Sequence, residues 1–330
     1  MTRGPERSQP REEVLCAPRG IGPDGDYPAP EQPEAFRSWF EREGFVVVRR
    51  AVPAAACQRA VQAFREEVLP DRDAWFERHA TGKFERHVYT DAGFMKFPIM
   101  NLQDLSSRRH PRFKALGLDV LTQPTIQRAL EVLLGEPGRA VYTMYFDGNQ
   151  ATWAHRDGSY FDAQRPGTMI GVWVAAEDIH PGAGRFYVVP GSHRIAVAGE
   201  RAEPHGVAYK ARMAEFVRNG PLDCVAPGLR QGDAILWTSL TIHGSLPTTE
   251  PRFSRRSFTA HYVPRSQSWQ WNTGARTGSR STVVNDVEIV LQRDESTLLR
   301  KAWNTLRLDL PRLYRVANGA REALARGRTE

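Results

Sequence analysis

The chain has 330 residues, 41% hydrophobic and 25% charged, a balance typical of a globular protein that can bury a substantial core. Its net charge of +7 is spread thinly, so the sequence argues against a nucleic-acid partner and favours a small anionic molecule. No apolar run approaches the ~20 residues of an integral membrane segment. The three cysteines are too scattered for a disulfide framework or a cysteine-based zinc site. With no secretory signal at the N-terminus, a cytoplasmic location is expected.

The first part of the chain predicts an arm followed by helices. Residues 1–30 are rich in proline and glycine and predict a flexible N-terminal arm. Beyond it, apolar residues recur at helical spacing, and the first helical segment meets Gly44, a typical C-terminal cap. A short apolar strand is expected over 45–50. The predicted helices cover 33–44, 53–68 and 122–136.

After Gly138 the pattern changes to short β-branched and aromatic runs separated by turns. The predicted strands cover 139–146, 168–176, 185–190, 233–238 and 257–263. Strands with few helices between them indicate an antiparallel sandwich or barrel. Residues 195–222 interrupt this rhythm, contain one helical segment and predict an insertion over one mouth of the sandwich. We expect a single catalytic domain over residues 31–283.

The C-terminal residues 284–330 predict a helical extension packed on the core. Three amphipathic, basic segments, 285–294, 295–308 and 311–328, are interpreted as its helices. A contact between copies in a homo-oligomer and a membrane-surface contact are the alternatives for their apolar faces.

The sharpest motif is AHRDGSY at 154–160. In a strand, residues i and i+2 point to the same face, so His155 and Asp157 project together while Arg156 points away. An imidazole beside a carboxylate is two thirds of the 2-His-1-carboxylate triad that holds non-haem Fe(II). His243, in LWTSLTIHGS, is the candidate for the third ligand. Alone, the first motif also suits a surface turn, and His243 also suits a hydrogen-bonded core residue.

Arginine residues near the last predicted strand offer an anion clamp. Arg255 and Ser257 fall on one face of RRSFTAHYV by the period of two. A guanidinium beside a hydroxyl suits a carboxylate, because arginine pairs with carboxylates in bidentate fashion. Arg256 faces the other way, and it replaces Arg255 as the clamp only if the register of the strand shifts by one residue.

A set of motifs together resembles the phytanoyl-CoA dioxygenase family of 2-oxoglutarate oxygenases. In chain order they are H-x-D, GVWVAAED, GAGRFYVVPGSHR, GDAILW, IHGS, the following arginine and HYVP. The resemblance implies a mainly β fold with flanking helices around a double-stranded β-helix core, the cupin-like jelly-roll. It implies Fe(II), 2-oxoglutarate and O2 as cofactor and co-substrates. It assigns catalytic, metal-binding roles to His155, Asp157 and His243, and 2-oxoglutarate binding to Arg255. Ser245 and Trp173 match positions that line the co-substrate pocket, although Trp173 also suits the core.

The function that this resemblance implies is oxidation, above all hydroxylation, of an unactivated C–H bond, with release of succinate and CO2. The aromatic residues and arginine expected at the mouth of the site suggest a small polar or anionic metabolite as substrate, for example a natural-product intermediate. The residues that we expect near such a substrate are Arg156, Tyr160, Phe161, Arg185 and His193. His193 is favoured instead as a residue that holds the PGSH turn. A non-catalytic jelly-roll binding protein and a redox-neutral, cupin-like metal enzyme are the alternatives.

Overall fold

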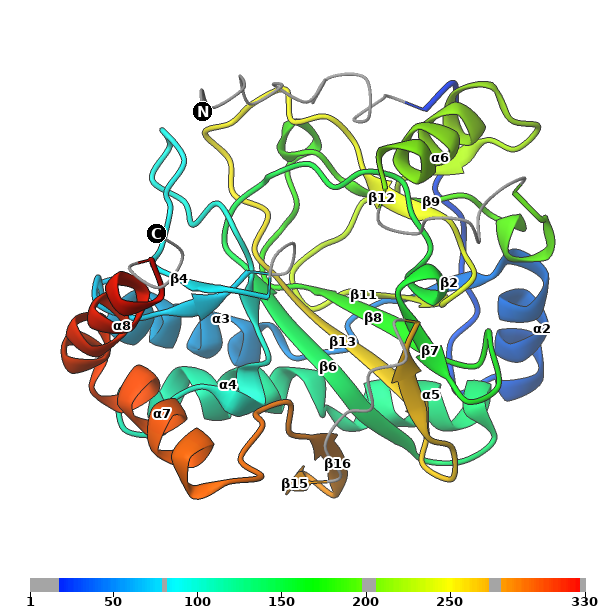
Figure 1. The fold of residues 1–330 in the computed structure, drawn as a ribbon. Helices are drawn as coiled ribbons and strands as arrows, with labels where there is room; N and C mark the ends of the chain where they lie inside the picture. Colours follow the sequence, from blue (N-terminus) through cyan, green and yellow to red (C-terminus); the bar gives the residue numbers. More distant parts are fainter. Residues whose placement is uncertain (1–17, 79–81, 198–205, 273–279, 327–330) are drawn as a thin grey trace.

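The computed structural model describes residues 18–78, 82–197, 206–272 and 280–326, and it contains two β-sheets packed on each other (Figure 1). The larger sheet has eight strands. In spatial order they are β15 (Ser281–Val284), β16 (Val287–Val290), β6 (Gly138–Phe146), β13 (Ser257–Pro264), β8 (Ile170–Ala175), β11 (Ala234–Thr238) and β2 (Phe45–Val48), with β5 (Ile99–Met100) also paired to β6. The smaller sheet has the order β1 (Ile21–Gly22), β10 (Cys224–Val225), β9 (Phe186–Val188) and β12 (His243–Ser245).

Each central strand of the larger sheet buries both faces, and the period of two divides its side chains between two cores. On β8, Val172 and Val174 belong to the core beneath the helices, whereas Trp173 faces the smaller sheet with Val188. On β11, Leu236 belongs to the core beneath the helices and Trp237 faces the smaller sheet. The larger sheet thus shares one core with the helices and another with the smaller sheet, so the predicted mainly β, jelly-roll fold with flanking helices is confirmed.

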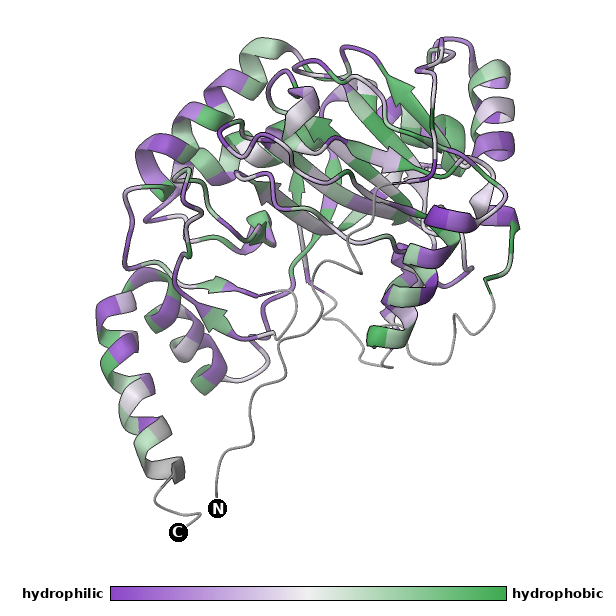
Figure 2. Ribbon diagram, turned by 90° about the horizontal axis from the view of Figure 1, so that it is seen from above, coloured by the Kyte–Doolittle hydropathy of each residue, from purple (hydrophilic) through white to green (hydrophobic). Residues whose placement is uncertain are grey.

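The N-terminal helices cover the outer face of the larger sheet (Figure 1). They are α2 (Pro33–Glu43), α3 (Ala54–Ala63) with a π-helical turn over Phe64–Val68, α4 (Pro111–Leu121) and α5 (Pro124–Leu134). Gly44 caps α2 with a left-handed φ of 78°, as its position in the sequence predicts. Helix α4 was not among the predicted segments. Figure 2 shows hydrophobic residues concentrated on the strands, with mixed hydropathy along the outer helices.

Several short elements complete the fold. The strands are β3 (Phe76–Glu77) paired with β4 (Phe84–Glu85), and β7 (Phe161–Ala163) paired with β14 (Trp269–Trp271). Short 3-10 turns cover Leu102–Asp104, Asp157–Ser159, Pro181–Ala183 and Ser192–Arg194. Helix α6 (Val207–Asn219) is the helix of the predicted insertion, of which residues 198–205 lie outside the described chain. Its Tyr209, Met213 and Val217 pack in one cluster with Tyr187 and Val189 at the smaller sheet.

The N-terminal arm differs from its prediction where the structure describes it. Residues 1–17 lie outside the described chain, but β1 pairs in parallel with β10. Asp24 accepts hydrogen bonds from the side chain of Arg49 and the backbone N–H of Gly228. Tyr27 packs edge-on against Trp39 and Phe45. Residues 18–30 are therefore held to the core by pairing, hydrogen bonds and aromatic contacts.

The helix predicted over residues 285–294 is wrong. Asn285 and Asp286 take positive φ values of 48° and 63°, the backbone of a tight two-residue hairpin between β15 and β16. Val287 and Ile289 then alternate into the core, and Ile289 pairs with Ala140 of β6. Two apolar β-branched residues at a spacing of two suit a strand better than a helical turn.

The last two helices of the chain, α7 (Leu298–Asp309) and α8 (Pro311–Arg326), form as expected. Tyr314 of α8 packs edge-on against both Trp303 of α7 and Trp75, and these contacts attach the helix pair to the body of the protein. Among the described helices, none is both long and apolar enough to cross a bilayer.

Candidate metal centre

Three side chains far apart in the sequence converge between the two sheets. His155 and His243 exchange backbone hydrogen bonds of 2.9 and 3.0 Å as an isolated antiparallel bridge, with His243 at the first position of β12. Asp157 follows His155 by two residues and begins a 3-10 turn. Arg156 between them is extended, with φ −117° and ψ 133°. This local geometry turns His155 and Asp157 to the same side.

The donor atoms of these residues are arranged as metal ligands. Nε2 of His155 lies 3.5 Å and Nε2 of His243 lies 3.6 Å from Oδ1 of Asp157. One ligand atom from each residue lies within 4.8 Å of the other two. Nδ1 of His155 lies 2.8 Å from the carbonyl of Trp153, and Nδ1 of His243 lies 3.0 Å from that of Thr241. Donation from each Nδ1 leaves Nε2 with a lone pair for a cation.

The second carboxylate oxygen of Asp157 is held by other groups. Trp237 Nε1–H donates to Oδ2 at 2.8 Å, and His261 Nε2 lies 3.1 Å from the same atom. Burial alone raises the pKa of Asp157, but the neighbouring His243, His261 and His155 hold it well below its usual range. Burial lowers the pKa of His243 to about 4. A carboxylate and neutral imidazoles are the protonation states that metal binding requires, so the three residues fit a divalent cation such as Fe(II).

The metal ligands open into a cavity of about 360 Å³. Its inner wall contains the expected Tyr160, Phe161, Trp173, Ser245 and Arg255. The remaining lining residues come from β6, β9, β11, β12 and β13, from the β3–β4 hairpin, from the segment before β5 and from residues 147–153. They include Arg78, Met95, Lys96, Phe97, Tyr142, Met144, Phe186, Trp237, Thr259 and His261. The volume suits a small metabolite together with a co-substrate.

Arg255 lies at one wall of this cavity without a carboxylate partner among the described residues. Its Nη1 and Nη2 donate to the carbonyls of Gly184 and Gln150, the latter at 2.9 Å, while Nε has no partner there. Burial lowers the pKa of Arg255 to about 10, so the guanidinium stays charged at neutral pH. The hydroxyls of Ser257 and Thr259, which follow on the same face of β13, are also buried without a hydrogen-bond partner in the described chain. A buried cation beside unsatisfied hydroxyls fits a carboxylate ligand.

Arg256 lies on the opposite face of the strand. Its Nε donates to Asp147 at 2.9 Å and its Nη1 donates to Glu177 at 3.0 Å. Two carboxylates thus already occupy this guanidinium, and the structure does not show the register shift that would exchange the two arginines.

Arg156, Arg185 and His193 are not among the cavity-lining residues of the described chain. Arg156 Nη2 donates to the carbonyls of Ser192 and Ile195, each at 2.6 Å. His193 Nε2 lies 3.0 Å from the carbonyl of Glu41. The structure therefore places these side chains against backbone of the loop after β9 and of α2. Arg185 directly precedes β9, and its carbonyl accepts from the N–H of Leu246.

Sequence reasoning missed several residues around the metal site. His261 could have been found, because it continues the alternation of Arg255, Ser257 and Thr259 along β13. Trp237 lies on a predicted strand, but nothing local marks it as a partner of Asp157. Arg78 and Lys96 come from a segment in which the sequence shows no motif. Only the packing of that segment over the cavity reveals them.

The fold and the site define the class of protein: a jelly-roll with a two-histidine, one-carboxylate cluster that could hold a metal, beside a buried arginine without a carboxylate partner among the described residues. The family model of phytanoyl-CoA dioxygenase (PhyH) matches residues 40–257. The chain therefore belongs to the phytanoyl-CoA dioxygenase family, as its motifs suggest.

Relatives at the sequence level are distant. Phytanoyl-CoA dioxygenase domain-containing protein 1 of Danio rerio is 26% identical over 201 residues, which cover 57% of this chain and 66% of the relative. The peroxisomal phytanoyl-CoA dioxygenase of Homo sapiens is 24% identical over 253 residues, with 69% and 67% covered. The chain thus spans about two thirds of the length of these relatives.

Solved structures share the fold. The non-heme alpha ketoglutarate dependent carbocyclase SnoK from nogalamycin biosynthesis superposes with a TM-score of 0.53 at 21% identity, covering 74% of this chain and 90% of SnoK. The epimerase SnoN, in complex with Fe3+, alpha ketoglutarate and nogalamycin RO, superposes with a TM-score of 0.57 at 20% identity, covering 79% of this chain and 99% of SnoN. At these identities the similarity concerns the architecture alone.

Proposed function

We propose that this protein is an Fe(II)- and 2-oxoglutarate-dependent oxygenase that hydroxylates an unactivated C–H bond of a small anionic metabolite, with release of succinate and CO2. The observation that carries the proposal is the convergence of His155, Asp157 and His243 in the same cavity as Arg255. These three residues would hold Fe(II), and the ion would supply binding of a chelating 2-oxo acid and activation of O2.

Iron at this centre supplies the oxygen activation that no side chain of the cavity can perform. The protein binds and orients the reactants around it. Arg255 pairs with the distal carboxylate of 2-oxoglutarate, and Ser257 and Thr259 offer hydroxyls along the same face of β13. The two carbonyls that Arg255 contacts hold its guanidinium in one orientation before the co-substrate arrives.

Aromatic side chains keep water away from the metal. Phe186 stacks on the His243 ring, with centroids 5.5 Å apart and an interplanar angle of 19°, and its centroid lies 5.8 Å from that of Trp173. Trp237 packs against His243 from another side at 4.9 Å. These rings fix the imidazole and lower the local dielectric, which strengthens the pairing of Arg255 with an anion.

An anionic substrate is supported by Lys96 and Arg78, two cations that line the cavity. Lys96 lines the cavity, and no carboxylate lies within ion-pair distance of its ammonium group among the described residues. Arg78, which is 5% exposed, packs over the ring of Phe97 and donates to Glu85 at 3.1 Å. With Phe97, Tyr160 and Phe161 as apolar walls, the chemistry favours a carboxylate or phosphate group on an apolar body.

Binding of metal and co-substrate is tested first. Anaerobic protein with Fe(II) and 2-oxoglutarate is expected to show the visible charge-transfer absorption of a chelate at an open facial triad. His155→Ala should abolish the band, whereas His180→Ala, at a histidine outside the cluster, should retain it. A wild-type sample that binds iron fully and stays colourless would rule out the proposal.

Turnover is tested next by succinate release over a panel that pairs each anionic compound with its neutral amide or ester. The active member should be anionic, and Lys96→Met should raise its KM several-fold with little change in kcat, because the contact forms before the chemical step. Mass spectrometry of the product distinguishes hydroxylation, which adds one oxygen, from cyclisation or desaturation, which removes two hydrogens. Activity limited to neutral members would contradict the anionic substrate class without affecting the metal assignment.

A further inference from the structure

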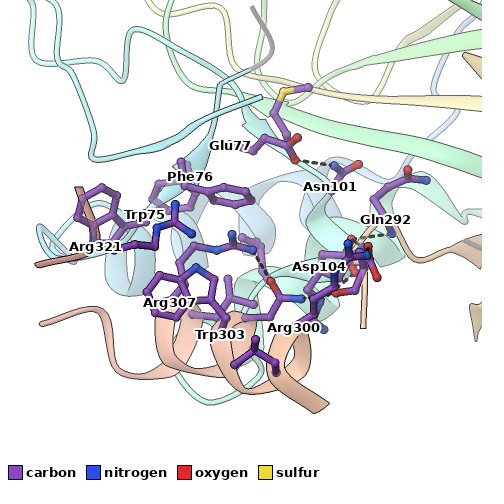
Figure 3. Close-up of a pocket in the computed structure, with 18 residues that line it drawn as sticks. Trp75, Phe76, Glu77, Asn101, Asp104, Gln292, Arg300, Trp303, Arg307 and Arg321 are labelled. Atoms are coloured by element: carbon purple, nitrogen blue, oxygen red, sulfur yellow. Dashed lines mark hydrogen bonds and ion pairs between the residues drawn. The ribbon is translucent and has the colours of Figure 1, made fainter. Parts of the chain in front are cut away.

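A second cavity, of about 550 Å³, lies between the C-terminal helices and the body of the protein (Figure 3). Helix α7 contributes Trp303 and Arg307, α8 contributes Arg321, and the segment that enters β3 contributes Trp75. In Figure 3, Glu77 and Asn101 lie across the cavity from Trp303. Its volume is within the range of sites for small organic ligands, and none of the metal ligands borders it.

Polar atoms around this cavity lack partners in the described part of the chain. Nε of Arg307, Nε1 of Trp75 and Oδ1 of Asn101 are all buried and make no hydrogen bond there. Arg307 and Asn101 are only 9% and 5% exposed. Buried polar groups are normally satisfied, and each one that is not destabilises the folded state. Two of these atoms, Nε of Arg307 and Nε1 of Trp75, are donors on two walls of one cavity, whereas Oδ1 of Asn101 is an acceptor. The two donors indicate an accepting ligand group near them.

The charges around the cavity leave cations without partners. Arg293 pairs with Asp104 at 3.2 Å, and Arg300 pairs with Asp294. Two further guanidiniums also line it, those of Arg307 and Arg321, and neither forms an ion pair with a described residue. Glu77 is the remaining carboxylate of the lining. It accepts a hydrogen bond from Asn101 at 3.3 Å rather than an ion pair from Arg307.

Both unpaired guanidiniums lie over aromatic rings. Cζ of Arg307 lies 3.3 Å from the ring centroid of Phe84, and Cζ of Arg321 lies 5.3 Å from that of Trp303. When the face of a guanidinium stacks on a ring, its N–H donors point outward from its edge. They can then bind a ligand that lies in the plane of the guanidinium. The lining also contains a set of apolar side chains: Phe76, Met100, Leu105, Leu299 and Leu308.

We propose that this cavity is a second ligand site, which takes an amphipathic anion: a carboxylate or sulfonate held by Arg307 and Arg321, on a flat apolar body held against Trp303 and the apolar side chains of the lining. The proposal does not depend on the reaction at the metal centre. A structural arginine buried to this extent is normally neutralised by a carboxylate, whereas the side-chain acceptors of Arg307 are neutral: Oδ1 of Asn304 at 2.8 Å and the hydroxyl of Tyr314.

The site shares a wall with the metal cavity. Arg78 and Glu85 at the β3–β4 hairpin line the metal cavity, whereas their neighbours Glu77 and Phe84 line the second one. An occupant of the second site therefore contacts the same hairpin without reaching the metal.

The probe pair 8-anilinonaphthalene-1-sulfonate and N-phenyl-1-naphthylamine tests the site, because the two share a fluorescent apolar body and differ in the sulfonate. Fluorescence titration of the full chain should show the sulfonate binding at least about tenfold more tightly than the neutral amine, as a charge-assisted contact implies. Arg307→Met should remove that preference. Arg321→Gln, at the exposed rim where folding is not at risk, should reduce it about threefold.

Arg312→Gln is the matched control, since Arg312 lies on α8, pairs with Asp73 and does not line the cavity. It should leave both probes unchanged, as should Arg255→Met in the metal cavity. Equal affinity of the two probes for the wild type, or an unchanged preference in both Arg307→Met and Arg321→Gln, would overturn the proposal. Loss of the preference in Arg255→Met alone would place the probe in the metal cavity and would equally refute it.

Discussion

The indole N–H of Trp237 donates a 2.8 Å hydrogen bond to Oδ2 of Asp157, which comes 80 residues earlier in the chain. This contact leaves Oδ1 as the carboxylate atom that faces His155 and His243. Trp237 is almost fully buried, and its ring packs on Phe186 and His243. A side chain outside the ligand set thus determines which carboxylate oxygen is available to a cation.

Trp237→Phe should weaken metal binding about tenfold, since loss of a hydrogen bond that orients a ligand typically costs 10- to 100-fold in affinity. Phenylalanine keeps an aromatic ring against His243 but cannot donate to Asp157. Calorimetric titration with Fe(II), under anaerobic conditions, measures the effect. Trp173→Phe is the control, because Trp173 lines the same cavity and makes no hydrogen bond to the ligands. Equal losses in the two variants would mean that ring packing, not donation, is responsible.

Gly171→Ala should displace Trp237 and impair both stability and metal binding. A Cβ atom at Gly171 on β8 would lie 2.3 Å from Cζ2 and 2.9 Å from Nε1 of the Trp237 indole, which has no room to move in the core. Overpacking of this kind costs about 1–3 kcal/mol. Thermal unfolding and metal titration should both report the change. Gly138→Ala, where the nearest atom would lie at an ordinary 3.4 Å, should be nearly neutral in both measurements.

Arg255→Met should weaken binding of 2-oxoglutarate, whereas Arg256→Met should lower the stability of the fold. Removal of Arg255 should raise the concentration of 2-oxoglutarate needed for half-saturation at least tenfold, because the distal carboxylate loses its cation. Removal of Arg256 should instead lower the free energy of unfolding by about 1–3 kcal/mol, because Asp147 stays buried without its partner. Co-substrate titrations and denaturant unfolding on both variants check this. A stronger effect of Arg256→Met on 2-oxoglutarate would refute the assignment.

His87 should make the protein less stable in acid. Burial, and then the nearby Arg78, lower its pKa from 6.5 to about 4, and neither ring nitrogen has a partner among the described residues. The unfolded chain therefore binds this proton more readily than the folded one, and stability is lost as the pH falls from about 6.5 to about 4.

His87→Phe, which retains the contact with Phe76, should reduce the loss of unfolding free energy between pH 7 and pH 5 by about 1–2 kcal/mol, a value discounted for partial exposure. Denaturant unfolding at the two pH values measures the difference. An identical pH dependence in wild type and variant would show that other groups, such as the buried His243, account for the loss.

Sequence patterns predicted the sheet well wherever both faces of a strand are buried. Strands β2, β6, β8, β9, β11 and β13 all form within the predicted ranges or one residue beyond them. The helix prediction for residues 285–294 was wrong because four apolar residues in a short segment suit both the helical and the strand period. Only the pairing of Ile289 with β6 selects the strand. The prediction of a flexible arm did not hold for residues 18–30. A sequence rich in proline and glycine shows no periodicity, yet Asp24 and Tyr27 in it have partners elsewhere in the chain.

Local chemistry in the sequence determined the strand faces, because neighbouring residues of an extended chain alternate by covalent geometry alone. It thereby set His155 beside Asp157, and Arg255 beside Ser257. Tertiary structure alone decided that His243 meets the first pair, and that Trp237 and His261 hold the far carboxylate oxygen. It also decided that Arg78, Glu85 and residues 95–98 line the cavity. The second cavity also exists only through the tertiary structure, because its walls come from segments more than 200 residues apart. No periodicity extends over such separations, and only the packing of sheets and helices brings these groups into contact.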